Sequence, residues 1–274
     1  MGMYHNRPHV QDIRAMKQRG QKISMLFVTT PDEAAAAAAA GIQMLSIEGR
    51  FFDAEMRAAA GDCFVQVGLP YGGWGSFNGR PLATAEDYLR AAFHYAALGG
   101  DAYYCAASYD IQKVLCDNHI PVVGHIGLIP SYISWTGWRA VGKTAAEAEA
   151  LWRHTQMLEK IGVFGAELEV VPDRVAKFLS ENSSIIMLGM GAGRHADAQY
   201  LFTEDVCGYG KNHKPRHGKV YRNLGPELDR IQAERIAAFK DYKADVDSGG
   251  YPAAEHSVAI RDDEFDAFLK SVKA

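Results

Sequence analysis

Short runs of apolar, β-forming residues recur along the chain and alternate with segments that carry helix signals. The runs occupy 23–28, 42–47, 63–69, 101–106, 121–130, 165–171 and 184–190, and 199–202 is a candidate for an eighth. Near-continuous apolar runs are typical of strands buried on both faces of a parallel sheet. Seven or eight successive strand–helix units predict an α/β protein with the (β/α)8 TIM-barrel fold.

Capping residues mark the helices between these runs. Thr84 and Thr144 are good N-caps, and each is followed by a segment of helical character. A helix over 10–19 is expected to cap the barrel, and a last helix over 227–243 precedes a polar tail. Because no linker or internal repeat interrupts the pattern, residues 1–274 are predicted to form a single domain.

Composition narrows the class of protein. The net charge of −4 does not indicate a basic surface for nucleic-acid binding, and no apolar run reaches membrane-spanning length. The first eight residues do not resemble a signal peptide. The four cysteines are scattered without a CxxC pair, which indicates reduced thiols and argues against structural zinc. We therefore expect a cytoplasmic protein that binds neither nucleic acid nor membrane.

The run over 121–130, PVVGHIGLIP, places one polar side chain at the end of a buried strand. Three apolar residues lead to Gly124, His125 follows, and Gly127 breaks the run. In TIM barrels the carboxyl-terminal ends of the strands carry the active site. His125 is therefore a candidate site residue, and the alternative is a histidine satisfied within the core.

Two carboxylates lie in the run over 165–171. Glu167 and Glu169 are two positions apart, so both side chains are predicted to point to the same face of a strand, the barrel interior. Buried carboxylates are costly unless they are paired or used. Glu169, nearer the strand end, is predicted to be a general base. The alternative is a structural ion pair within the barrel.

Other strand ends carry weaker signals. Glu48 and Arg50 follow the second strand, where a guanidinium would suit a substrate carboxylate, although a solvated loop explains the pair equally well. Tyr104 ends the fourth strand and is a candidate substrate contact or a plain core residue. Cys105 is expected to be inert, because nothing in the sequence indicates a lowered thiol pKa.

A glycine-rich turn follows the seventh strand. Glycines at 189, 191 and 193 would let backbone N–H groups approach an anion, so Gly191 is predicted to contact the substrate. The alternative is a tight strand-to-helix turn. The spacing does not match the dinucleotide-binding GxGxxG pattern.

Several longer segments resemble the ketopantoate hydroxymethyltransferase family of the phosphoenolpyruvate mutase and isocitrate lyase superfamily. The segments are IRAMKQRGQKISML (13–26), AGI (40–42), GHIGLIP (124–130), GWRAVGKT (137–144), ELEVVP (167–172), GMGAG (189–193) and YPAAEHSV (251–258). The resemblance implies a cytoplasmic, homo-oligomeric TIM barrel of pantothenate biosynthesis. It further implies Mg2+-assisted, aldol-type transfer of a hydroxymethyl group from methylenetetrahydrofolate to a branched 2-oxo acid. By resemblance, Glu169 falls on the family's catalytic base and His125 on a histidine that lines the substrate pocket.

The family's metal ligands are missing from the matching positions. Its Gly-Asp-Ser after strand two is replaced by Glu48-Gly49-Arg50, its strand-three aspartate by Gly68, and its strand-four glutamate segment by residues that include Ala106. Since Mg2+ needs several oxygen ligands and only Glu48 could stand in, we expect no metal site. Arg50 is predicted to replace the metal's positive charge, with Glu167 as its compensating partner.

Three functions remain open from the sequence. The first is a hydroxymethyltransferase-like enzyme that forms the enolate of a small 2-oxo acid with Glu169 as base. The second is a metal-independent C–C lyase, decarboxylase or isomerase acting on a different carboxylic acid, with Arg50 in place of the metal. The third is a non-catalytic binding or assembly subunit. Convergence of Glu169, His125, Arg50 and Tyr104 on one pocket would favour an enzyme.

Overall fold

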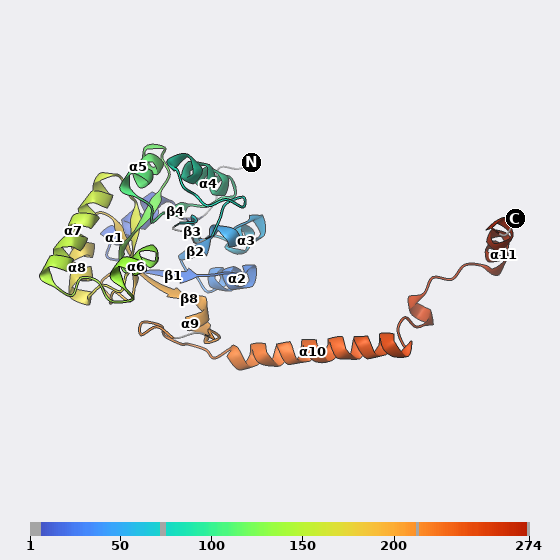
Figure 1. Cartoon of the computed structure of the whole chain (residues 1–274). Coiled ribbons are helices and arrows are strands. Elements are labelled where there is room, and N and C mark those ends of the chain that lie inside the picture. Colours follow the sequence, from blue (N-terminus) through green and yellow to red (C-terminus); the bar gives the residue numbers. More distant parts are fainter. Residues whose placement is uncertain (1–6, 72–74, 212–213, 273–274) are drawn as a thin grey trace. The chain divides into compact units, whose positions relative to one another are not determined.

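The eight predicted strands close into one parallel barrel. The structure, a computed structural model, describes residues 7–71, 75–211 and 214–272. The strands pair in chain order and β1 closes on β8, so the (β/α)8 prediction is confirmed (Figure 1). Their bounds are β1 Ile23–Phe27, β2 Met44–Glu48, β3 Phe64–Gly68, β4 Ala102–Tyr104, β5 Val122–Gly127, β6 Gly165–Glu169, β7 Ile186–Met190 and β8 Ala198–Phe202.

Helices follow the strands around the barrel, except that a turn without a helix leads from β7 to β8 (Figure 1). Their bounds are α1 Val10–Gln18, α2 Pro31–Ala39, α3 Ala54–Ala59, α4 Ala85–Ala97, α5 Tyr109–Asp117, α6 Ile133–Thr136, α7 Ala145–Lys160, α8 Asp173–Asn182 and α9 Thr203–Cys207, with short 3-10 turns η1 Gly49–Phe51 and η2 Pro130–Tyr132. Thr84 and Thr144 cap α4 and α7 as predicted, each hydroxyl accepting a backbone N–H of the first turn. Helices α6, α8 and α9 were not predicted.

The N-terminal helix α1 caps the barrel, as predicted. Ile13 is fully buried in the same apolar cluster as Met25 and Phe64, whose side chains fill the barrel interior. Lys17 Nζ, on the same helix, donates to Asp197 Oδ2 at 2.9 Å and to the Ile185 carbonyl at 2.6 Å. These contacts close the end of the barrel at which the strands begin.

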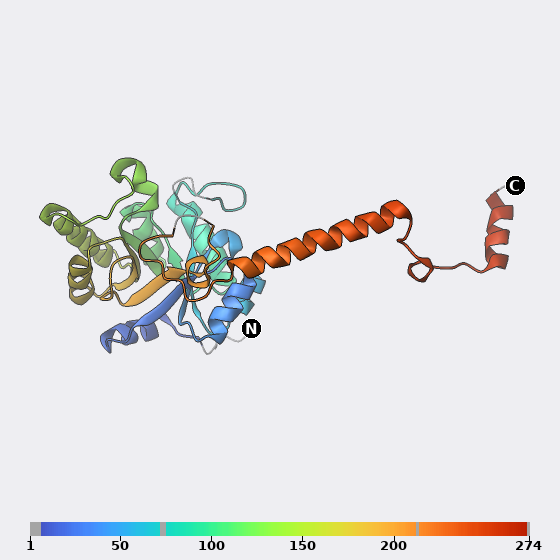
Figure 2. The ribbon, with the colours of Figure 1, turned by 90° about the horizontal axis from the view of Figure 1, so that it is seen from below.

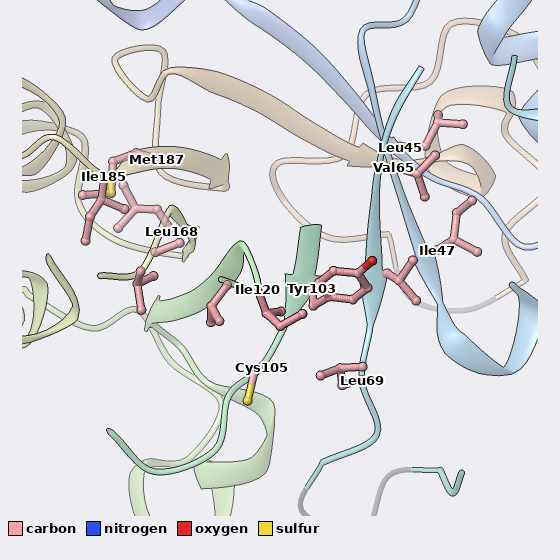
Figure 3. Close-up of a cluster of buried hydrophobic side chains, with 14 of the residues drawn as sticks. Leu45, Ile47, Val65, Leu69, Tyr103, Cys105, Ile120, Leu168, Ile185 and Met187 are labelled. Carbon is pink, nitrogen blue, oxygen red and sulfur yellow. The ribbon is translucent and has the colours of Figure 1, made fainter. Parts of the chain in front are cut away.

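Two apolar layers are separated by the sheet because strand side chains alternate in direction. The outer layer packs strand residues such as Leu45, Val65, Tyr103 and Met187 against the helices (Figure 3). The inner layer fills the lower barrel and includes Ile23, Met44, Val123, Ile186 and Leu188. The upper part of the barrel is thereby left for polar side chains.

The described residues 222–272 belong to a second compact unit. It contains helix α10 (Gly225–Ser248), visible as one continuous helix in Figure 2, the turn η3 (Ala254–His256) and helix α11 (Asp262–Val272). The segment predicted as a polar tail contains helix α11, which was not predicted; acidic residues in its first turn and a lysine in its last suit the helix dipole. A single domain over 1–274 stays a prediction. Within the described ranges, no helix combines the length and apolarity needed to cross a membrane.

Candidate active site

A cavity of about 440 Å³ opens where the strands end. It is lined by Phe27, Ser46, Glu48, Gly49, Arg50, Gly68, Leu69, Pro70, Tyr71, Gly75, Ser76, Tyr104, His125, Pro130, Trp138, Glu167, Glu169, Met190, Tyr200 and Phe202. The structure therefore brings together five of the predicted site residues. These are Glu48, Arg50, Tyr104, His125 and Glu169.

The register of β5 and β6 places the central polar group. His125 lies opposite Glu167, and Gly127 lies opposite Glu169. Because strand side chains alternate, His125, Glu167 and Glu169 all point into the barrel, as the two-residue spacing of the glutamates predicted. Glu169 is the last residue of β6. Because Glu167 comes two residues earlier on the same strand, it lies deeper in the barrel.

His125 lies between the two carboxylates with its side chain only 1% exposed. Its Nδ1 is 2.8 Å from the Tyr104 hydroxyl and 3.6 Å from Glu167 Oε2. Its Nε2 is 3.2 Å from Glu169 Oε2, a close contact whose angles do not make a hydrogen bond. From outside the sheet, His154 Nε2 donates to the His125 carbonyl at 2.8 Å, which fixes the backbone at this position.

Sequence reasoning missed two deep polar residues, Gln66 on β3 and Ser46 on β2. Gln66 is fully buried, and its Nε2 donates to Glu167 Oε1 at 2.7 Å and to Ser46 Oγ at 3.2 Å. A glutamine within the otherwise apolar run FVQVG was a signal that could have found this site. The amide joins β2, β3 and β6 across the interior of the barrel.

Burial controls the charges at this site. It raises the pKa of Glu167 to about 7, an effect that nearby Glu169 reinforces and that His125 and Gln66 oppose. Burial also raises the pKa of Tyr104 and of Tyr200 well above the ordinary value. These phenols are therefore neutral hydrogen-bond donors at any physiological pH.

The raised pKa of Glu167 predicts a pH-dependent stability. Between the ordinary pKa of 4.5 and about 7 the folded state binds the proton more tightly than the unfolded chain, so stability falls as pH rises. The shift corresponds to roughly 3 kcal/mol. In urea unfolding, the free energy of unfolding of Glu167→Gln minus that of wild type should therefore be about 3 kcal/mol larger at pH 8 than at pH 5. The same stability difference at both pH values would contradict the raised pKa of Glu167.

Arg50 lies at the rim and pairs with its neighbour. Its Nε is 2.6 Å from Glu48 Oε2, the side chains being 61% and 45% exposed, and its guanidinium lies 4.6 Å from the centre of the Phe51 ring. The predicted pairing of Arg50 with Glu167 is wrong, because Glu167 is held by Gln66 and His125. The short turn η1 keeps Arg50 beside Glu48. Gly49 is required there because a Cβ would lie 2.4 Å from the Tyr95 hydroxyl.

Gly191 directly follows β7, next to the cavity-lining residue Met190. With φ at +68° it needs a glycine, and a Cβ there would lie 2.7 Å from His217 Nδ1. A Cβ on Gly193 would lie 1.9 Å from Asp173 Oδ1, so the turn packs against a carboxylate. The turn connects β7 directly to β8, so it is a strand-to-strand turn and not the strand-to-helix turn of the alternative, and Gly191 is not among the residues that line the cavity.

The donor set does not fit Mg2+. Gly68 and Ala106 offer no side-chain oxygen at the ends of β3 and β4, and the Glu48 carboxylate is engaged by Arg50. Within residues 7–71, 75–211 and 214–272, no three His, Cys, Asp or Glu side chains are grouped so as to hold a metal ion. A hard cation needs more oxygen ligands than these positions supply.

The matching family model and the sequence relatives point to the same family. Residues 51–254 match the sequence model of ketopantoate hydroxymethyltransferase. A 3-methyl-2-oxobutanoate hydroxymethyltransferase 2 of Hahella chejuensis is 32% identical over 77% of this chain and 75% of its own length. The 3-methyl-2-oxobutanoate hydroxymethyltransferase of Lysinibacillus sphaericus is 28% identical over 96% and 98%. Among solved structures, 2,3-dimethylmalate lyase, described as a PEP mutase/isocitrate lyase superfamily member, superposes with a TM-score of 0.47 at 13% identity, covering 94% and 90% of the two chains.

Proposed function

The chain belongs to the ketopantoate hydroxymethyltransferase family and is an enzyme, and on that premise we propose that it transfers a hydroxymethyl group to a small 2-oxo acid through an enolate. The observation that carries the proposal is the placement of Glu169. Its carboxylate lies at the end of β6, 13% exposed, in the cavity beside His125. A carboxylate so placed can reach a substrate proton while remaining partly shielded from water.

Glu169 acts as the base in this proposal. Its carboxylate takes the proton from the carbon next to the keto group, and the C–H electron pair moves into the bond between that carbon and the keto carbon. Methylenetetrahydrofolate, as second substrate, supplies the one-carbon unit: water breaks its two C–N bonds and releases tetrahydrofolate and formaldehyde. The nucleophilic carbon attacks the formaldehyde carbon, the C=O π pair moves to oxygen, and this alkoxide takes the proton held by Glu169 to give the hydroxymethyl group. His125 orients the Glu169 carboxylate, and the neutral Tyr104 hydroxyl orients His125.

The cavity wall suits a short branched acid. Phe27, Leu69, Met190 and Phe202 provide an apolar lining for an aliphatic side chain. Arg50 at the rim is the guanidinium that would bind the substrate carboxylate. A homo-oligomer and a cytoplasmic location, both implied by the resemblance, remain predictions.

A second candidate function is favoured by the missing metal donors. A metal-independent C–C lyase, decarboxylase or isomerase of another carboxylic acid would use the same Glu169 base, with Arg50 in place of a metal charge. The two candidates separate in one assay that supplies 3-methyl-2-oxobutanoate and methylenetetrahydrofolate, with and without EDTA. Formation of the hydroxymethylated acid supports the first candidate. Absence of product, together with turnover of another 2-oxo acid, supports the second.

Substitution of Arg50 should affect binding more than chemistry. We expect Arg50→Ala to raise KM for the 2-oxo acid about tenfold with kcat nearly unchanged, because the ion pair with the substrate forms equally in ground and transition states. Steady-state kinetics measures both constants. Arg90→Ala is the matched control, since Arg90 is 64% exposed in an ion pair with Glu86 on α4. An unchanged KM in Arg50→Ala would remove Arg50 from the site.

A further inference from the structure

The two carboxyl groups of β6 share one cavity but have different surroundings. Glu169 lies at the strand end, next to His125 Nε2 and within electrostatic reach of His217. Glu167 is buried one pleat deeper, where Gln66 Nε2 donates to its Oε1. Two carboxyl groups in different environments within one cavity are a usual arrangement of a catalytic acid and base.

One oxygen of Glu167 remains available to a ligand. Oε1 accepts the Gln66 hydrogen bond at 2.7 Å. The other, Oε2, lies 3.6 Å from His125 Nδ1, which the Tyr104 hydroxyl already contacts at 2.8 Å. In the described part of the chain no hydrogen bond reaches Oε2, and Glu167 lines the cavity. A carboxyl oxygen in this position can carry a proton and present it to a bound molecule.

The groups around Glu167 do not hold it in the ionised form. The phenols of Tyr104, Tyr200 and Tyr71 face it from β4, β8 and the loop after β3, and their pKa values are all raised. The carboxylate of Glu169 repels a second negative charge on the same strand. Among the described residues, His125 is the group whose charge favours ionisation of Glu167, and it is shared with Glu169.

The positively charged side chain that lines the cavity lies at its rim, away from Glu167. Among the cavity-lining residues that the structure describes, Arg50 is the one lysine or arginine, and its guanidinium is engaged by Glu48 at the rim. Residues 7–71, 75–211 and 214–272 therefore supply the barrel interior with neither a metal donor set nor an unpaired lysine or arginine. The negative charge that develops on a keto oxygen during enolisation must be met by a proton donor.

We propose that Glu167 is the general acid of this site, donating its proton to the keto oxygen while Glu169 removes the proton from the adjacent carbon. This inference rests on the proposed function. The C–H pair forms the new C=C bond, the C=O π pair moves to oxygen, and the O–H bond forms as Glu167 becomes a carboxylate. When the enol carbon attacks the one-carbon unit, the C=O bond re-forms and the proton returns to Glu167. Gln66 is the positioning residue that fixes Oε1 and leaves Oε2 facing the cavity.

The held proton can be observed directly in the wild-type protein. Infrared spectroscopy at pH 6 should show the C=O stretch of a protonated carboxylic acid that disappears as pH rises through about 7. Glu167→Gln should lack this band, while Glu169→Gln and the surface control Glu181→Gln, whose side chain is 61% exposed, should keep it. A band that is absent from wild type, or that persists in Glu167→Gln, would overturn the proposal without reference to activity.

Deuterium exchange into 3-methyl-2-oxobutanoate then tests the catalytic role. Wild-type exchange should fall as pH rises through about 7, because the acid must be protonated. Glu167→Gln should lose about 100-fold at pH 6 and should lack this alkaline fall, since its amide donates a hydrogen bond but transfers no proton.

The outcomes separate the two proposals. Exchange in Glu167→Gln within threefold of wild type, with the same pH profile, would overturn the role of Glu167 and leave the proposed function standing. Absence of exchange in wild type would overturn the proposed function and this inference with it. A loss confined to KM would likewise contradict an acid role, because a merely structural change to the pocket weakens binding without removing the pH dependence.

Discussion

Glu169→Gln is expected to slow deuterium exchange at C3 of 3-methyl-2-oxobutanoate by about 10³-fold or more. The amide has nearly the size of the carboxylate but cannot accept the substrate proton, and a positioned base contributes roughly 10²- to 10⁴-fold. Because the shape of the cavity is kept, binding of the acid should change little, so the loss should appear in kcat. The methyl doublet of the substrate, which collapses to a singlet as C3 is deuterated, gives the rate by NMR.

Glu181→Gln is a matched control for this experiment. Glu181 lies on α8, outside the cavity, with its side chain 61% exposed. Its replacement removes one carboxylate from the same protein and should leave the exchange rate within a factor of two. Retention of more than a tenth of wild-type exchange by Glu169→Gln, with an unchanged melting temperature, would show that another group is the base.

Gly127→Ala is expected to cost about 3 kcal/mol of stability or more and to displace the base. Gly127 has φ at +101°, and an added Cβ would lie 2.2 Å from the Glu169 carbonyl oxygen and 2.6 Å from Val171 Cγ2. Backbone strain of 1–3 kcal/mol therefore adds to a clash with atoms that cannot rotate away. Relief of the clash must move the end of β6, so exchange should fall together with stability.

Gly41→Ala separates the cost of backbone strain from the cost of the steric clash. Gly41 also has a positive φ, +76°, but nothing lies within 4 Å of the added Cβ. We expect a loss of only about 1 kcal/mol there, the cost of the left-handed conformation for a residue with a side chain. Urea unfolding measures both variants. Equal losses of stability in Gly127→Ala and Gly41→Ala would mean that the β5–β6 contact accommodates the added Cβ and does not hold Glu169 in place.

The fold could be predicted because its information is local and repeated. Each buried strand is a short apolar run, and helices such as α4 and α7 have their own capping signals, so the barrel follows from counting strands even though α6, α8 and α9 were not predicted. The shared direction of Glu167 and Glu169 follows from the two-residue period of a strand. The position of His125 beside them follows from the succession of β5 and β6 in the barrel.

Contacts across the barrel could not be predicted in the same way. Gln66 on β3 reaches Glu167 on β6, and no sequence spacing encodes that distance. Arg50 was assigned to Glu167 on charge alone, whereas the turn η1 holds it against Glu48. Helix α11 was missed because its segment was judged by its polarity rather than by the period of Phe265, Phe268 and Val272.

The most direct test of the account is deuterium exchange at C3 of 3-methyl-2-oxobutanoate by the wild-type protein, followed by NMR with and without EDTA. The account predicts exchange that persists in EDTA, because Glu169 removes the proton and the described residues do not supply a Mg2+ site. Exchange abolished by EDTA and restored by Mg2+ would contradict the conclusion drawn from the donor set. No exchange from a folded sample would contradict the assignment of Glu169 as the base for this acid.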